Sequence, residues 1–181
     1  KQYIQFIGPY FAQKKFIDHQ SDHTPALNDT IVSLTSITSR YKSLPTVIAS
    51  VLNQSAPPHS VHLWIKAGTA NLLPSALSAL TGRGLMIHEC QDVGPHTKLI
   101  HALREFPEYN IVTADDDIIY PHNWLSSLHT EHLLHPLDVS AYTTRQIRVE
   151  SNSSNPLPYH DWTRIKEQTN HSHPHFMALG Y

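Results

Sequence analysis

The sequence predicts an α/β protein built on a mainly parallel sheet with helices on both faces. Short β-branched runs alternate along the chain with segments of about ten residues in which apolar side chains recur at helical spacing. Such alternation is typical of right-handed β-α-β crossovers. The fourth run, Ile111 to Thr113, is apolar as in a strand buried on both faces, and three aspartates follow it closely.

Length and composition limit the organisation of the chain. Its 181 residues suit one domain with a sizeable core. Within that length we expect residues 1–29 to form an extension and linker and residues 30–150 to form the α/β domain. Residues 151–181 are expected to be an incomplete segment, because few carboxylates and little periodicity remain there.

Charge and cysteine content exclude several classes of protein. A formal net charge of -2 offers no field to attract nucleic acid. A single cysteine, Cys90, rules out an internal disulfide and fits a reducing compartment, and the Asn-x-Ser/Thr sequences would permit glycosylation only in a secreted chain. No apolar run has the length of a transmembrane helix, and no signal peptide is visible. We therefore expect a soluble cytoplasmic protein.

The first half of the expected sheet can be followed in order. Residues 31–37 are β-branched and form the first strand, and Arg40 follows in a polar loop. A helix should carry the apolar residues between Val47 and Leu52 and stop before Pro57. The loop after the first strand of such a sheet opens on the ligand crevice, where an arginine can meet phosphate.

The same unit repeats towards the acidic strand. We expect strands at residues 61–65 and 85–90, and helices at residues 72–80 and 97–106. After the acidic strand, a helix should run from Pro121 to near residue 136, and residues 139–149 look extended. The only tight histidine group, to which we assign no role, comprises His171, His173 and His175.

Residues 115–117 are the strongest candidate for chemistry. Adjacent carboxylates destabilise one another and raise each other's pKa unless a cation or several donors hold them. Hard oxygen ligands at the carboxyl end of a buried strand suit Mg²⁺ or Mn²⁺ carrying a phosphate-bearing ligand. The structural alternative is an acidic turn that merely ends the strand, but apolar residues on both sides favour a site.

Two sequence blocks resemble a known family. They are residues 93–99 (VGPHTKL) and residues 111–125 (IVTADDDIIYPHNWL). Together with the strand and helix alternation, they resemble the donor half of a glycosyltransferase of the GT-A fold, a Rossmann-like sheet. The resemblance is to family 2-like enzymes of bacterial polysaccharide and lipopolysaccharide synthesis. It covers roughly residues 30–150, which would then be the nucleotide-sugar-binding domain.

The resemblance implies roles for the acidic residues. Asp115 would lie nearest the nucleotide ribose, and Asp117 would ligate a divalent metal, Mn²⁺ or Mg²⁺, that bridges the donor diphosphate. Asp116 would share that metal or orient its waters. Which of the three is the direct ligand stays open.

The resemblance also implies roles outside the triplet. Thr35 and Arg40 match positions that line the nucleotide pocket, and Asp92 lies where related enzymes contact the base. Lys98 would face the diphosphate or a uridine-like base, and its structural alternative is an exposed helix lysine. Asp161 is the candidate catalytic base, with a solvated loop aspartate as its alternative.

The implied function is transfer of a sugar from a nucleotide-diphosphate donor to a glycan or another hydroxyl acceptor. The resemblance leaves peripheral contact with the inner face of a membrane open. One alternative is a nucleotide-sugar-binding domain without catalysis, because the expected acidic pair downstream is missing. Another is a metal-dependent phosphohydrolase, although an aspartate nucleophile of that kind usually follows the first strand of the sheet and not the fourth.

Overall fold

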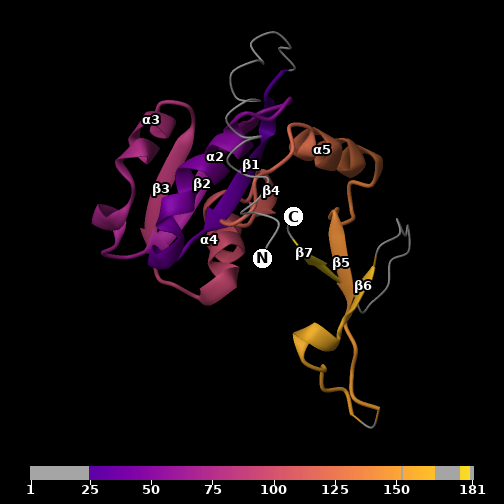
Figure 1. Ribbon diagram of the computed structural model, residues 1–181. Coiled ribbons are helices and arrows are strands. Elements are labelled where there is room, and N and C mark those ends of the chain that lie inside the picture. Colours follow the sequence, from indigo (N-terminus) through magenta and orange to yellow (C-terminus); the bar gives the residue numbers. More distant parts are fainter. Residues whose placement is uncertain (1–24, 152, 166–175, 180–181) are drawn as a thin grey trace. The chain divides into compact units, whose positions relative to one another are not determined.

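The chain falls into two units, residues 1–129 and 130–181, which are described separately. The computed structural model describes residues 25–151, 153–165 and 176–179 (Figure 1). Most of the expected N-terminal extension, residues 1–24, lies outside the described residues. So does the histidine group at residues 171–175.

The first unit is built on a four-stranded parallel sheet in the order β3-β2-β1-β4. In register, Leu34 of β1 lies opposite Leu63 on one side and Ala114 on the other. All carboxyl ends therefore meet at one edge, and the predicted α/β class with a mainly parallel sheet is confirmed. The strands are β1 (Leu27–Thr35), β2 (Pro58–Lys66), β3 (Leu85–Cys90) and β4 (Asn110–Ala114).

Helices connect the strands and cover both faces of the sheet. Side chains alternate along a strand, so Leu34 and Leu63 face α2, whereas Ser33 faces α4 and donates to the backbone oxygen of Lys98. No helix among the described residues is long and apolar enough to cross a bilayer. The main helical elements of this unit are η1 (Thr38–Ser43), α2 (Leu44–Leu52), η4 (Gly94–His96), α4 (Thr97–Glu105) and α5 (Trp124–Leu134), which runs into the second unit.

The prediction of a single helix at residues 72–80 is wrong. The segment holds two 3₁₀ turns, η2 (Ala70–Leu72) and η3 (Ser75–Leu77), and one α-helical turn, α3 (Ser78–Thr81). Pro74 is the physical reason, because a proline lacks the amide hydrogen and disfavours helical conformation in the residue before it. The residue before it is accordingly extended, with φ -69° and ψ 143°.

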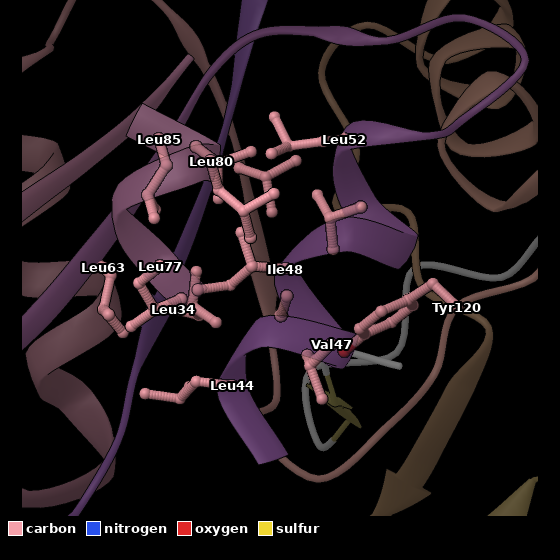
Figure 2. Close-up of a cluster of buried hydrophobic side chains, with 14 of the residues drawn as sticks. Leu34, Leu44, Val47, Ile48, Leu52, Leu63, Leu77, Leu80, Leu85 and Tyr120 are labelled. Atoms are coloured by element: carbon pink, nitrogen blue, oxygen red, sulfur yellow. The ribbon is translucent and has the colours of Figure 1, made fainter. Parts of the chain in front are cut away.

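An aliphatic core fills the space between the sheet and α2 (Figure 2). Leu34 and Leu63 from the sheet meet Ile48 of α2, and all three are fully buried. Burying one such side chain contributes roughly 1.5–3 kcal/mol. Leu77 and Leu80 belong to the same cluster, so the broken segment before β3 still delivers the apolar side chains that its spacing predicts.

The opposite face of the sheet carries polar and aromatic side chains. Trp64 stacks on His88, with ring centroids 4.2 Å apart, and donates through Nε1 to the hydroxyl of Ser33. His62 is 1% exposed, and its ring bonds to the hydroxyl of Ser60 at 2.8 Å and to the ring of His88 at 2.9 Å. His62 is buried and His88 is half-buried beside it, so desolvation favours the neutral form of both imidazoles.

The second unit holds a small antiparallel sheet in the order β6-β5-β7. Its strands are β5 (Thr143–Gln146), β6 (Thr163–Ile165) and β7 (Phe176–Leu179). β5 pairs with both others, so part of the extended segment 139–149 belongs with the C-terminal residues. The division between units thus falls at residue 129, whereas composition suggested residue 150.

The buried histidine pair predicts a loss of stability in mild acid. Burial, and after it the charges of His88 and His59, lower the pKa of His62 to about 4. Burial also lowers the pKa of His88, against a smaller opposite effect from Glu105. The unfolded chain therefore binds protons below about pH 6.5 that the folded chain excludes, so the stabilisation is complete above that pH and is lost towards pH 4.

We expect the free energy of unfolding, measured with urea, to fall by roughly 2–3 kcal/mol between about pH 7.5 and 5. His62→Gln should remove a large part of this dependence, because its side chain does not titrate. His96→Gln is the control, since His96 is exposed. A pH dependence that survives unchanged in His62→Gln would show that other groups cause it.

Candidate functional site

The acidic triplet begins directly after β4, at the carboxyl edge of the parallel sheet. Its three side chains differ in exposure: 40% for Asp115, 7% for Asp116 and 43% for Asp117. The chain leaves β4 after Ala114 and turns at Asp116 and Asp117, and in that turn the Asp116 carboxylate is directed to the loop after β1. Two carboxylates are accessible to a ligand, and one is turned into the protein.

Asp116 is held by two partners from the loop after β1. Arg40 Nη1 donates to one carboxylate oxygen at 2.7 Å, and Ser36 Oγ donates to the other at 2.6 Å. The hydrogen bond and the negative charge of Asp116 raise the pKa of the Arg40 guanidinium above its ordinary value. A buried carboxylate needs such partners, since leaving it unpaired costs several kcal/mol. Asp116 therefore ties the loop after β1 to the end of β4.

Asp115 is paired with Lys98, which lies near the start of α4. The ammonium of Lys98 contacts one carboxylate oxygen of Asp115 and lies 3.4 Å from the backbone oxygen of Ala114. Gly94, with φ +70°, allows the sharp turn from which η4 and then α4 begin, because glycine adopts that conformation without strain. The connection after β3 thus crosses the sheet so that Lys98 reaches the end of β4, the strand at the opposite edge.

Tyr120 fixes the backbone at the start of the triplet. The amide of Asp115 donates to its hydroxyl oxygen at 2.6 Å, and the ring packs on Trp124 with centroids 4.1 Å apart. Burial, with the charges of the three aspartates, raises the pKa of Tyr120, so the hydroxyl stays protonated. Gln54 holds the following residues by donating to the Pro121 carbonyl at 2.8 Å and accepting the Leu125 amide at 2.9 Å.

Asp117 is the least engaged member of the triplet. It has one ionic contact, 3.4 Å from Arg40 Nη1. The three carboxylates of the triplet and the two cations that contact them, Arg40 and Lys98, sum to a formal charge of -1. Among the residues that the structure describes, no three His, Cys, Asp or Glu side chains converge as a ready-made metal site would require. The inward turn of Asp116 accounts for that in the triplet.

Thr35 and Asp92 lie at the same edge of the sheet, where each has a local structural partner. Thr35 ends β1 and donates through Oγ1 to the backbone oxygen of Trp64 at 2.9 Å. Asp92 follows β3 and accepts the Gly94 amide at 2.8 Å, so it shapes the turn into η4. Both positions are compatible with a ligand bound at this edge. The hydrogen bonds described for the two side chains go to residues outside the triplet.

Asp161 belongs to the second unit. It ends the 3₁₀ turn η5 (Tyr159–Asp161), is exposed, and has its carboxylate 3.6 Å from His160 Nε2. The Asp161 amide donates to the Pro158 carbonyl at 2.9 Å, which fixes the turn. Its surroundings are those of a solvated turn residue, as the structural alternative in the sequence implies.

Sequence reasoning missed the residues that hold the site together. It gave no role to Ser36, Tyr120 or Gln54. A tyrosine five residues after an aspartate carries no recognisable signal, and the same is true of a serine after a strand. The contact of Ser36 comes from the sheet order, which places the end of β1 beside the end of β4, whereas Tyr120 and Gln54 act on the segment that follows β4.

Comparison with known proteins adds no family to this picture. No protein-family model matches the sequence, and no curated protein matches it.

The different surroundings of Asp116 and Asp117 give a test of structural against ligand-binding roles. Asp116→Asn should lower the free energy of unfolding by about 1–3 kcal/mol, because the charged partner of Arg40 is lost in a buried position. Asp117→Asn is the matched change at an exposed carboxylate and should cost at most about 0.5 kcal/mol. Urea unfolding measures both, and equal losses would contradict the assignment of Asp116 as the structural member.

Proposed function

We propose that the chain is a metal-assisted glycosyltransferase of the GT-A type, similar to family 2 enzymes, that uses a nucleotide-diphosphate sugar. The carrying observation is the meeting of two cations and three carboxylates at the carboxyl edge of a parallel sheet. Ligands of open α/β sheets bind at that edge. A diphosphate needs cations, and a divalent metal needs carboxylates, so this mixed cluster suits both together.

The donor set fits a hard divalent cation. Asp115 and Asp117 offer exposed carboxylate oxygens, which are the ligands that Mn²⁺ and Mg²⁺ prefer. Asp116 is less suited as a direct ligand, because both of its oxygens are hydrogen-bonded within the protein. When bound, such a metal would stabilise the negative charge that develops on the departing diphosphate.

The chain's own residues would then act as follows. Arg40, fixed by Asp116, and Lys98 would hold the donor diphosphate by charge-assisted hydrogen bonds. Thr35 and Asp92 would border the nucleoside. In the reaction, the acceptor oxygen bonds to the anomeric carbon while the bond from that carbon to the diphosphate oxygen breaks. The nucleoside diphosphate leaves with the electron pair.

The hydroxyl proton of the acceptor must pass to a base. The resemblance implies such a base in a downstream acidic pair, which the chain lacks, and Asp161 is the candidate in its place, with an exposed carboxylate that can accept a proton. General-base help contributes about 10² to 10⁴ in rate, whereas donor binding does not depend on it. Donor binding is therefore the property that tests the proposal without a known acceptor.

A thermal-stability screen provides that test. The chain is heated with each common nucleoside diphosphate, with Mn²⁺ and with a chelator. A ligand that binds only the native state raises the midpoint of unfolding by mass action, by several degrees for a domain of this size at about a hundred times Kd. No shift with any nucleoside diphosphate in the presence of Mn²⁺ would contradict the proposal.

Metal dependence gives a sharper prediction. Without a divalent cation, the carboxylates should repel the diphosphate, so the nucleoside diphosphate identified by the screen should bind weakly. Asp117→Asn should reduce the Mn²⁺-dependent affinity at least about tenfold, because an amide is a poor ligand for a hard cation. Titration calorimetry measures both, and equal affinity with Mn²⁺ and with chelator would argue against a metal site.

Lys98 should contribute to donor binding by charge. Lys98→Ala should weaken nucleoside diphosphate binding in the presence of Mn²⁺ by about ten- to a hundredfold, as expected for loss of one charge-assisted contact. Arg104→Ala removes the same charge from an exposed position on α4 and is the control. Wild-type affinity in Lys98→Ala would show that Lys98 pairs with Asp115 without contacting the nucleotide.

A further inference from the structure

The ion pair between Lys98 and Asp115 places a cation where a metal would have to bind. The Lys98 side chain is only 17% exposed, and its ammonium contacts oxygens of two consecutive residues, the carboxylate of Asp115 and the carbonyl of Ala114. The backbone oxygen of Lys98 accepts the hydroxyl of Ser33, so the helix start is itself fixed to β1. The ammonium is thus held at the end of β4 and is not a freely solvated group.

The two cations of the site differ in how easily they can leave. Arg40 is bound to Asp116, a buried carboxylate that a bound metal has no need to displace. Lys98 is bound to Asp115, an accessible one. The Arg40 guanidinium also lies 3.4 Å from the accessible Asp117, but its shorter contact of 2.7 Å fixes it to the buried Asp116. A lysine ammonium on its flexible stem changes direction at small cost. Lys98 is therefore the cation whose closest partner is an accessible carboxylate, and it competes most directly with an incoming metal.

We propose that Lys98 is a resident cation that a divalent metal displaces from Asp115, which frees its ammonium for the diphosphate of the nucleotide. This inference rests on the proposed function. Two cations beside one carboxylate repel each other. Without nucleotide, a metal that binds Asp115 must therefore compete with the Lys98 ammonium. A diphosphate gives the displaced ammonium a new partner, and the metal and the nucleotide then strengthen each other's binding.

The direction in which Mn²⁺ affinity changes when Lys98 is removed separates this role from two simpler ones. If Lys98 only contacts the diphosphate, its removal leaves Mn²⁺ affinity unchanged in the absence of nucleotide. If Lys98 only holds Asp115 in place, its removal weakens Mn²⁺ binding. If Lys98 competes with the metal, its removal strengthens Mn²⁺ binding and, at the same time, weakens nucleotide binding.

The experiment measures Mn²⁺ binding to the 181-residue chain without nucleotide, by titration calorimetry and by the electron paramagnetic resonance signal of free Mn²⁺. Lys98→Met should bind Mn²⁺ about tenfold more tightly than the wild type, since competition of this kind is typically worth a factor of about 5 to 150. Lys98→Arg keeps the charge and should not gain. Arg104→Met removes a charge from the exposed face of α4 and should change the affinity by less than about twofold.

A double variant shows whether the gain passes through Asp115. Lys98→Met combined with Asp115→Asn should lose the gain, because the carboxylate that Lys98 released is gone. Circular dichroism checks that each variant folds, and Lys98→Gln, expected to gain in the same direction, replaces Lys98→Met if the latter does not fold. Unchanged or weaker Mn²⁺ binding in the folded variant overturns the inference.

The outcomes also distinguish this inference from the proposed function. Stronger Mn²⁺ binding in Lys98→Met, with no nucleoside diphosphate bound by any form of the chain, supports the displacement of Lys98 and contradicts the glycosyltransferase proposal. Metal-dependent nucleotide binding without the gain in Lys98→Met supports the proposed function and overturns the inference. Absence of Mn²⁺ binding in every form, both alone and with each common nucleoside diphosphate, contradicts both.

Discussion

Neutralisation of three adjacent carboxylates at the end of β4 is the constraint on which the site depends. Like charges on consecutive residues are tolerable only where cations and donors surround them. Here the cations come from two different connections, Arg40 from the loop after β1 and Lys98 from the start of α4. The acidic run therefore joins segments that are far apart in sequence, and the edge of the sheet is organised around it.

The different roles of the three aspartates follow from that constraint. Asp116 turns inward, where Arg40 and Ser36 satisfy it, and acts as the fixed point of the edge. Its two neighbours are more exposed, with 40% and 43% of their side-chain surface accessible. Tyr120 holds the backbone of Asp115, so the exposed carboxylates project from a rigid base. Rigid placement of ligands lowers the entropy lost when a metal or a diphosphate binds.

The fold was largely predictable from sequence, because it depends on periodicity. Short β-branched and apolar runs indicated the strands. The acidic run after the fourth strand indicated the edge of the sheet at which a ligand would bind. The prediction of one helix at residues 72–80 was wrong because Pro74 prevents a continuous helix, although the apolar spacing was correct.

The site was less predictable, because its partners are set by the sheet order and not by local spacing. Local spacing does not show that the chain turns at Asp116 and Asp117, nor that Arg40 and Ser36 lie where the Asp116 carboxylate reaches them. The roles of Arg40 and Lys98 towards a donor stay predictions.

The central claim is that the exposed carboxylates of this edge hold a divalent cation together with a nucleoside diphosphate. Anomalous diffraction at the manganese edge, from crystals of the chain grown with Mn²⁺ and the nucleoside diphosphate that stabilises it, tests this most directly. The account predicts a manganese peak at about 2.2 Å from a carboxylate oxygen of Asp115 or Asp117, with phosphate oxygens on the same ion. A bound nucleotide whose phosphates lie elsewhere, or a manganese ion away from both residues, would contradict it.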